Sequence, residues 1–321
     1  QVFGTLFASA GADIYRLDRH PVMSQHPVTP MGEADLSKHL AAQTDLKVSI
    51  VDLAAMKAGE SDFAISRGLS AGAKIIAIDV VDDETLVEAG RIICSDERTV
   101  FAVGSQGVEY ALIAHWRVLG ILEAQHTAPV LSPVNQIFAV SGSCALTTAD
   151  QIAVAEAKGF QVLDLDASTA TDDRRLAAEI EFAKGACLSL LSQGQDVLVT
   201  TARGPNDPRV TRLNEAIMTS GATSGEVNAR LGTALGQLVF DIRHKTKMRR
   251  IAIGGGDTSG HALAQLGADA LSAVAPLAPG APMCRVHTRA DPAVDGLEVT
   301  LKGGQMGQPT FFLEAKGGPQ T

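Results

Sequence analysis

The alternation of short apolar runs with segments of helical period constrains the fold of this chain more than any other feature of its sequence. The apolar runs are rich in Val, Ile and Ala and are bounded by polar or glycine positions, which is typical of strands buried in a sheet. They cover residues 48–53, 74–79, 100–104, 137–141, 162–165, 197–201 and 251–254.

Segments with the helical period lie between these runs. A chain that repeats strand and helix in this order predicts parallel sheets with helices on both faces. We therefore expect an α/β fold with mainly parallel sheets. The predicted helices cover residues 34–42, 83–89, 108–119, 148–157, 174–192 and 224–243.

The length of 321 residues is large for one hydrophobic core, so we expect two α/β domains. The stretch TAPVLSPVN at residues 127–135 separates two series of strands and helices, and it has two prolines, no charge and no helical period. We predict one domain over residues 1–133 and a second over residues 134–321. The opening residues lack an initiator Met and look like the interior of a domain, so we expect that residues precede Gln1 and that the first domain is incomplete at its start.

The composition excludes several classes of function. The 27 basic and 36 acidic residues give a net charge of −9, which disfavours binding to nucleic-acid backbones. No apolar run approaches the ~20 residues that span a bilayer, so no membrane partner is expected. The cysteines stand far apart without Cys-x-x-Cys spacing, so we predict reduced, mostly buried thiols of a cytoplasmic protein. They are Cys94, Cys144, Cys187 and Cys284.

Glycine-rich turns follow three of the predicted strands: FAVGSQG at 101–107, FAVSGSC at 138–144 and IAIGGGDTSG at 251–260. Ligands of parallel sheets bind at the carboxyl ends of the strands, where bare backbone and helix N-termini favour anions such as phosphate. We expect the two turns in the second half to converge on one ligand, and the turn at 101–107 to reflect ordinary packing. Helix capping by Asp257 or Thr258 would also account for the polar residues of the third turn.

Three further features are open to a structural or a functional interpretation. Lys302 in TLKGGQMG, at 300–307, would suit phosphate as a point charge, but taken alone it is interpreted as a surface residue at a hairpin. The stretch ARGPNDPR at 202–209 is predicted to be a solvated loop. His26 and His115 are interpreted as loop and core residues rather than ligands.

Several named motifs are missing from the sequence. There is no Walker pattern, the dinucleotide pattern G-x-G-x-x-G fails at Ser259, and no H-E-x-x-H pair supports zinc hydrolysis. A nicotinamide-dependent oxidoreductase is therefore disfavoured, and no residue is assigned as a metal ligand.

Several separate motifs together resemble the four-carbon acid sugar kinase family. In the second half they are VSGSCALTTADQ at 140–151, IGGGDTSG at 253–260, APGAP at 278–282 and LKGGQMG followed by FF at 301–312. In the first half, HPVTPM at 26–31, the segment ADLSKHLAAQ after it and GSQG at 104–107 are similar to that family's N-terminal domain. The resemblance covers nearly the whole chain.

The resemblance implies two α/β domains, the first binding an acid sugar and the second binding ATP with Mg²⁺. It implies an ATP-dependent phosphotransferase that acts on the terminal alcohol of a four-carbon sugar acid such as 3-oxo-tetronate, threonate or erythronate. Carried over by motif, the nucleotide contacts would be Ser143, Gly255, Gly256, Asp257, Thr258 and Gly304.

Two departures from the family pattern leave an alternative open. The family begins with an Asp-Asp-x-Thr-Gly-Ala motif that helps to bind the acid sugar and contributes the catalytic acid; this motif does not occur here, so we expect it before Gln1. KGGQMG replaces the KSGNFG of some members, which blurs the substrate subgroup. The alternative is a nucleotide-binding sensor or effector without catalysis; a homo-oligomer is compatible with either function.

Overall fold

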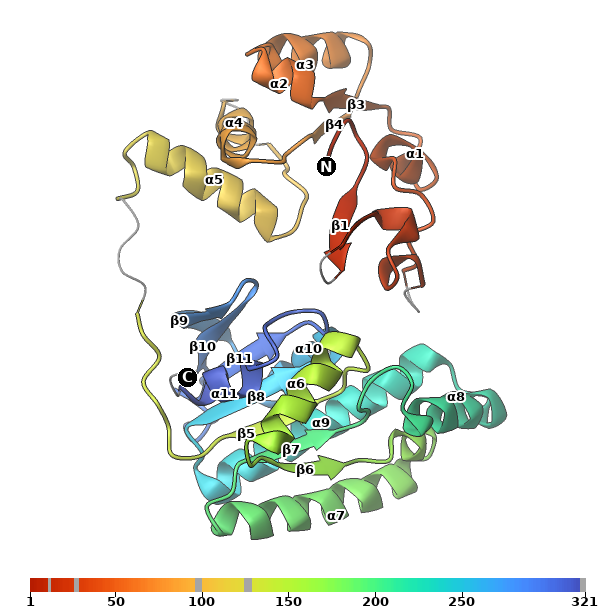
Figure 1. Cartoon of the computed structure of the whole chain (residues 1–321), viewed down its shortest axis with the longest axis vertical. Helices are drawn as coiled ribbons and strands as arrows, with labels where there is room; N and C mark the ends of the chain where they lie inside the picture. The colour runs from red at the N-terminus through yellow and green to blue at the C-terminus, as the bar shows by residue number, and fades with distance from the viewer. Residues whose placement is uncertain (11–12, 26–28, 96–99, 124–128, 318–321) are drawn as a thin grey trace. The chain divides into compact units, whose positions relative to one another are not determined.

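The computed structural model describes residues 1–10, 13–25, 29–95, 100–123 and 129–317 (Figure 1). Its contacts divide the chain into two compact units, unit 1 over residues 1–126 and unit 2 over residues 127–321; the predicted boundary lies between residues 133 and 134. His26, and residues 127 and 128 of the predicted boundary segment, lie outside the described residues. None of the described helices is long and apolar enough to cross a membrane.

Unit 1 contains two small pairs of strands. Strands β1 (Phe7–Ala10) and β2 (Asp13–Arg16) form an antiparallel pair that was not predicted. Strand β3 (Val48–Val51) runs parallel to β4 (Ile75–Ile78), and both lie within predicted strands. The helices are α1 (Leu36–Ala41), α2 (Leu53–Lys57), α3 (Ser61–Ser70), α4 (Asp83–Cys94) and α5 (Gln106–Val118).

The predicted strand at residues 100–104 is wrong. These residues form no strand, and the side chains of Phe101 and Val103 are 90% and 81% exposed. β-propensity describes how well side chains fit a half-buried pleated surface, and this segment pairs with no strand in the described part of the chain. The turn at 101–107 leads directly into α5, whose N-cap Ser105 makes no side-chain capping bond.

A buried carboxylate holds the start of unit 1 against its parallel strands. Asp79 follows β4 and is fully buried. Its carboxylate oxygens accept the N–H groups of Gly4 at 3.0 Å and Leu53 at 3.2 Å. This bridge joins segments far apart in sequence, and a buried charge needs such donors to be tolerated.

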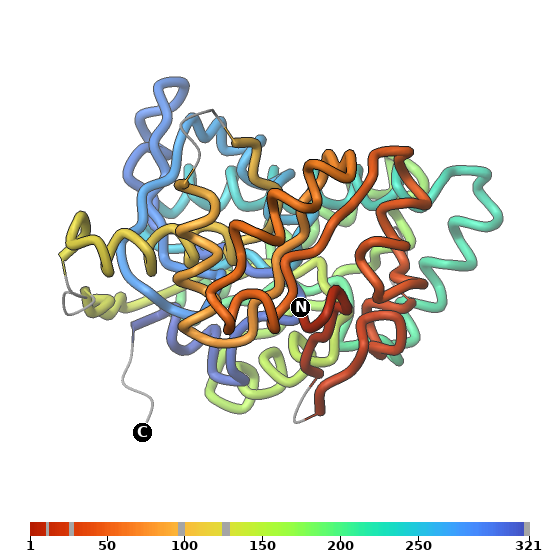
Figure 2. Tube along the Cα trace, turned by 90° about the horizontal axis from the view of Figure 1, so that it is seen from above, coloured from red at the N-terminus to blue at the C-terminus, as the bar shows by residue number. Residues whose placement is uncertain are grey.

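Unit 2 is built around one seven-stranded sheet with the order β6-β7-β5-β8-β11-β10-β9. The five strands from β6 to β11 in this order are parallel, which confirms the predicted mainly parallel sheet. The antiparallel hairpin of β9 and β10 was not predicted, and it extends outward as the blue loop at the upper left of Figure 2. The strands are β5 (Phe138–Ser141), β6 (Gln161–Asp164), β7 (Val197–Thr200), β8 (Arg250–Gly254), β9 (Ala270–Ala278), β10 (Ala281–His287) and β11 (Glu298–Lys302).

Helices cover both faces of this sheet, as the apolar runs predict. On one face α6 (Leu146–Ala157) and α11 (Phe311–Lys316) pack against Ala139, Leu198 and Ala252. On the other face α7 (Asp173–Ser192), α9 (Ser224–Thr246) and α10 (Gly256–Gln265) pack against Phe138 and Ile253. Helix α8 (Pro208–Ser220) follows the loop after β7.

The prediction that the cysteines are mostly buried is wrong. Cys187 is buried in the core of unit 2, Cys284 is half-buried, and Cys94 and Cys144 are exposed. Burial raises the pKa of the Cys187 thiol to about 12, so this thiol is inert. Cys94 is the last residue of α4, and Cys144 lies between β5 and α6. Because both stand at the ends of elements and not on a face that packs against the core, the apolar character of the thiol does not bury them.

Candidate functional site

The carboxyl ends of β5 and β8 lie at the topological switch point of the sheet in unit 2, where the helices that follow two neighbouring strands lie on opposite faces. The two strands are parallel neighbours, but β5 leads into α6 on one face and β8 leads into α10 on the other. A crevice opens at such a point in open α/β sheets, and ligands of these folds bind there. Both glycine-rich turns that were predicted to converge lie at this point.

Three turns meet here and are called the glycine turns: residues 141–143 after β5, 254–256 after β8 and 302–304 after β11. Backbone hydrogen bonds join them, because Gly142 N–H donates to the Gly254 carbonyl at 2.9 Å and Gly255 N–H donates to the Lys302 carbonyl at 2.9 Å. The predicted contact residues Ser143, Gly255 and Gly304 are thereby brought together.

Two of the glycines are required by close approach. A Cβ atom on Gly142 would lie 2.1 Å from Thr258 Oγ1, and one on Gly304 would lie 2.5 Å from Ser143 Oγ. Gly255 has a φ of +110°, which strains any residue with a side chain. The glycine turns are therefore packed against one another and leave no room for side chains between them.

The start of α10 is the open side of the site. Gly256 is exposed, and a Cβ atom added to it would meet nothing within 4 Å. The N-cap of α10 is Gly255, which makes no side-chain capping bond. The first N–H groups of α10 are therefore available to a ligand, and the helix dipole favours an anion at this end.

The capping interpretation of Asp257 and Thr258 is wrong, because the N-cap is Gly255 and both residues lie inside the first turn of α10. Thr258 is buried and packs against Gly142. Asp257 is exposed, and its carboxylate makes no hydrogen bond or ion pair with any described residue. Asp257 is thus an exposed acid in the first turn of α10.

Lys302 is buried, contrary to its interpretation as a surface residue: only 1% of it is exposed, since β11 carries it beneath α6 and α11. Its ammonium donates to Thr148 Oγ1 at 2.9 Å and to the Gly303 carbonyl at 3.1 Å. No carboxylate among the described residues pairs with it. Burial lowers the pKa of Lys302 to about 8.

Ser143 and Thr148 link Lys302 to the glycine turns. Thr148 Oγ1 lies 2.9 Å from the Gly304 carbonyl and 3.2 Å from Ser143 Oγ. Ser143 Oγ also accepts the N–H of Ala145 at 3.2 Å. The Ser143 hydroxyl is therefore part of a buried polar chain as well as a neighbour of the open site.

Gln151 is a site residue that was not predicted. It is fully buried on α6, and its Nε2 lies within 2.9–3.1 Å of three consecutive carbonyls, those of Met306, Gly307 and Gln308. It fixes the loop that follows the third glycine turn. In the sequence Gln151 looks like any polar residue of a helix, and only its place at the end of the motif at 140–151 marks it.

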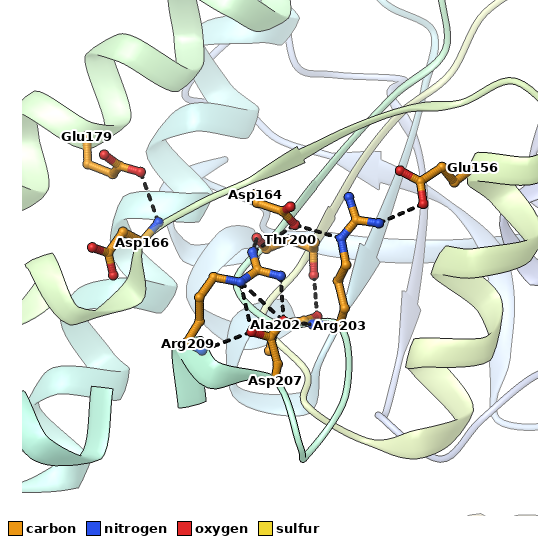
Figure 3. A network of polar contacts seen from close by, with 9 residues as sticks. All are labelled: Glu156, Asp164, Asp166, Glu179, Thr200, Ala202, Arg203, Asp207 and Arg209. Atoms are coloured by element: carbon orange, nitrogen blue, oxygen red, sulfur yellow. Dashed lines mark hydrogen bonds and ion pairs between the residues drawn. The ribbon is translucent and has the colours of Figure 1, made fainter. Parts of the chain in front are cut away.

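The loop at 202–209 was predicted to be solvated, and this holds for Pro205, Asn206 and Pro208, which are exposed, but not for its charged residues (Figure 3). Arg209 is only 9% exposed; it donates to Asp207 at 2.6 Å and pairs with Asp164 at 2.8 Å. Arg203 donates to Asp164 at 2.9 Å and to Glu156 at 2.6 Å. The Arg209 guanidinium holds the pKa of Asp207 well below its ordinary range. These pairs tie the loop to the ends of β6 and α6.

A cleft of about 590 Å³ lies beside this network, lined by Leu146 and Ala149 of α6 and by the loop at 203–209. Two guanidinium groups of its wall, those of Arg203 and Arg209, are already paired with carboxylates, whereas the third, that of Arg212, has no ion pair with a described residue. The glycine turns offer bare N–H groups and an ammonium without a carboxylate partner. An anion is therefore expected first at the glycine turns, where several N–H groups and the start of α10 come together, and Arg212 makes the cleft a second candidate.

No group of three or more His, Cys, Asp or Glu side chains that could hold a metal ion occurs in the described ranges.

The two halves of the chain match two family models. Residues 1–112 match a sugar-binding N-terminal domain, and residues 138–312 match a nucleotide-binding C-terminal domain. The glycine turns after β5, β8 and β11 all lie within the second match.

Characterised relatives and solved structures agree with these matches. The chain is 42% identical over 313 residues to the 3-oxo-isoapionate kinase of Paraburkholderia graminis and 31% identical over 298 residues to the 3-oxo-tetronate kinase of Methylobacterium radiotolerans. These alignments cover 97% and 91% of this chain but only 66% and 65% of the relatives. The crystal structure of Haemophilus influenzae protein HI1011 has the same fold, with a TM-score of 0.59 at 20% identity, over 98% of this chain and 70% of that protein. By its two domain matches and this sequence similarity, the chain belongs to the four-carbon acid sugar kinase family.

Proposed function

We propose that this protein is an ATP-dependent kinase that phosphorylates the terminal hydroxyl of a small sugar acid. The observation that carries the proposal is the meeting of three glycine turns with the uncapped start of α10 and the ammonium of Lys302. Phosphoryl transfer depends mainly on positioning and on neutralising charge, and this site offers both.

The nucleotide would be held mainly by backbone groups. Gly255, Gly256 and Gly304 bring the main chain close to the phosphates, and the N–H groups at the start of α10 donate to them. Ser143 and Thr258 are 8% and 6% exposed, so we assign them the shaping of the turns together with contacts at the edge of the site. The nucleotide role of all six predicted residues is part of this proposal.

Asp257 fits a role toward Mg²⁺. Proteins commonly bind this ion through one or two carboxylates, several waters and the substrate's phosphates, so a dedicated cluster of ligands is not needed. The exposed Asp257 carboxylate makes no bond that braces the turn, which favours a contact with Mg²⁺ through water. When bound, the ion would supply positive charge to the transferred phosphoryl group.

The sugar acid is assigned to unit 1, in agreement with the sugar-binding match of residues 1–112. The names of the relatives suggest a 3-oxo sugar acid, and 3-oxo-isoapionate, 3-oxo-tetronate, threonate and erythronate are the substrates to try first. The Asp-Asp-x-Thr-Gly-Ala motif of the family stays the predicted source of the catalytic acid. A metabolic kinase acting on such acids is proposed to be cytoplasmic.

A coupled assay of ADP release tests the proposal, with the full-length protein, ATP, Mg²⁺ and a panel of sugar acids. The expected result is ADP release that depends on one or a few of the acids. ATP binding in calorimetry without ADP release on any acid would favour the sensor or effector alternative. Absence of ATP binding would refute both functions.

A further inference from the structure

Lys302 carries a buried ammonium without a carboxylate partner in the described part of the chain, and nucleotide binding by backbone groups alone gives no reason for its presence. An ammonium that is 1% exposed is costly to bury, and in most proteins a carboxylate compensates it. Here the described neighbours are all neutral: the Thr148 hydroxyl from α6, the Gly303 carbonyl of its own turn, and the ring of Phe311 from α11 with its centroid 5.8 Å away. Arg250 and Glu298, the buried ion pair of the same two strands, lie at the opposite ends of β8 and β11.

The polar chain that starts at Lys302 ends at the glycine turns. Lys302 donates to Thr148 Oγ1, which leaves the Thr148 hydroxyl hydrogen for the Gly304 carbonyl at 2.9 Å or Ser143 Oγ at 3.2 Å. The ammonium therefore orients one hydroxyl that touches two of the three turns. It also places a positive charge beside the third glycine turn, at the Gly303 carbonyl.

We propose that Lys302 is a positioning residue of the nucleotide site. It holds the glycine turns through Thr148, and its buried positive charge is balanced only when the phosphates are bound. This inference rests on the proposed ATP binding at the glycine turns. The anion that compensates the Lys302 ammonium then belongs to the ligand and not to the protein. This accounts for a buried ammonium that has no carboxylate partner among the described residues.

Proton uptake on ATP binding is the first consequence. The pKa of Lys302 is about 8 in the free protein because of burial, and nearby phosphates favour its charged form and raise that pKa. The protonated protein thus binds ATP more tightly, so the affinity is constant below pH 8 and falls as the pH rises above it. Up to about half a proton should be taken up at pH 8.

The substitution Lys302→Met distinguishes a role of Lys302 in positioning the glycine turns for ATP from a role in the stability of the fold alone. Removal of a buried charge leaves the melting temperature equal to or above that of the parent, since the unfavourable burial of the ammonium is gone. ATP binding is nevertheless expected to weaken about tenfold or more. A residue that only supported the fold would lower both stability and affinity.

The experiment is titration calorimetry with ATP at pH 7, 8 and 9, in two buffers of different ionisation enthalpy. All variants are made in a Cys144→Ser background, which removes the exposed thiol next to Ser143. Lys158→Met is the matched control: it removes the same charge from the exposed far end of α6. Thr148→Val breaks the chain without changing a charge, and it is expected to weaken ATP binding while preserving proton uptake.

The expected result is proton uptake near pH 8 in the parent and in Lys158→Met, and its loss in Lys302→Met together with weaker binding. Equal ATP affinity of the parent and Lys302→Met would overturn the inference. If Lys302→Met does not fold, ATP binding by the parent without proton uptake at pH 7, 8 or 9 would overturn it. A parent that binds no ATP at any pH refutes the proposed function itself, and the inference with it.

Discussion

Single residues of the site divide into those that shape the glycine turns and those that face the open side. Gly142 and Gly304 belong to the first group, because a Cβ atom on either would collide with a buried hydroxyl. Gly256 and Asp257 belong to the second group. Substitutions in the second group should therefore change ligand binding more than stability.

Gly256→Val should weaken ATP binding at least about tenfold, because a branched side chain would occupy the space of the phosphates and their hydrogen bonds. Stability should change little, since nothing lies within 4 Å of the added Cβ. Calorimetry with ATP and Mg²⁺ measures the affinity. Gly260→Val, one helical turn later and equally open, is the control and should bind ATP like the parent. Equal affinity of Gly256→Val and the parent would remove this turn from the site.

Asp257→Asn should lower turnover of the sugar acid while leaving ATP binding without Mg²⁺ nearly unchanged, because the proposed role of the exposed carboxylate is toward the ion and not toward the nucleotide. Asp257→Glu should retain much of the activity, since a contact through water tolerates one added methylene. The ADP-release assay and calorimetry with and without Mg²⁺ check both variants. If the Asp257→Asn variant matched the parent in both turnover and ATP binding, the Asp257 carboxylate would have no role in the reaction.

At the scale of elements, the position of α10 depends on how closely α9 approaches it. A Cβ atom on Gly236 of α9 would lie 2.8 Å from Ala262 Cα in α10. The uncapped end of α10 therefore owes its place beside the glycine turns to a glycine in a different helix. Helix propensity alone would favour alanine at this position.

Gly236→Ala should lower the free energy of unfolding by about 1–3 kcal/mol despite its better helix propensity, because α10 must move. ATP affinity should fall as well, since the start of α10 moves with the helix. Gly185→Ala in α7, with nothing within 4 Å of the added Cβ, should instead raise stability by about 0.5–1 kcal/mol. Urea denaturation of both variants tests this, and a Gly236→Ala protein as stable as Gly185→Ala would contradict it.

At the scale of the whole molecule, the two units have separate cores and separate proposed ligands. All proposed ATP contacts lie in unit 2. Ligand binding stabilises only the cooperative unit that holds the ligand, by about 2.7 kcal/mol at a hundredfold excess over Kd.

Saturating ATP should therefore slow hydrogen exchange in unit 2, most of all in the glycine turns and the first turn of α10, and leave α2 to α4 of unit 1 unchanged. Exchange mass spectrometry with and without ATP measures this at the level of peptides, with buffer containing only Mg²⁺ as the control. Protection confined to unit 1 would mean that the ligands were assigned to the wrong units.

The amino-acid sequence by itself determined the α/β class, the parallel strands at 48–53, 74–79 and in unit 2, and the two glycine-rich turns that meet at the ends of β5 and β8. These features are local, because residues close to one another in the sequence specify the apolar period, the glycine turns and the order of the elements. The strand expected at 100–104 failed, since its apolar run pairs with no described strand.

Only the tertiary structure decided the burial of the polar residues. Lys302, Arg209 and Gln151 look like surface residues in the sequence, yet each is at most 9% exposed. Their partners, Thr148 for Lys302, Asp164 for Arg209 and the carbonyls of 306–308 for Gln151, lie from 45 to 157 residues away in sequence. Whether a polar side chain is buried depends on distant groups that satisfy its hydrogen bonds, and chain folding alone brings those groups together.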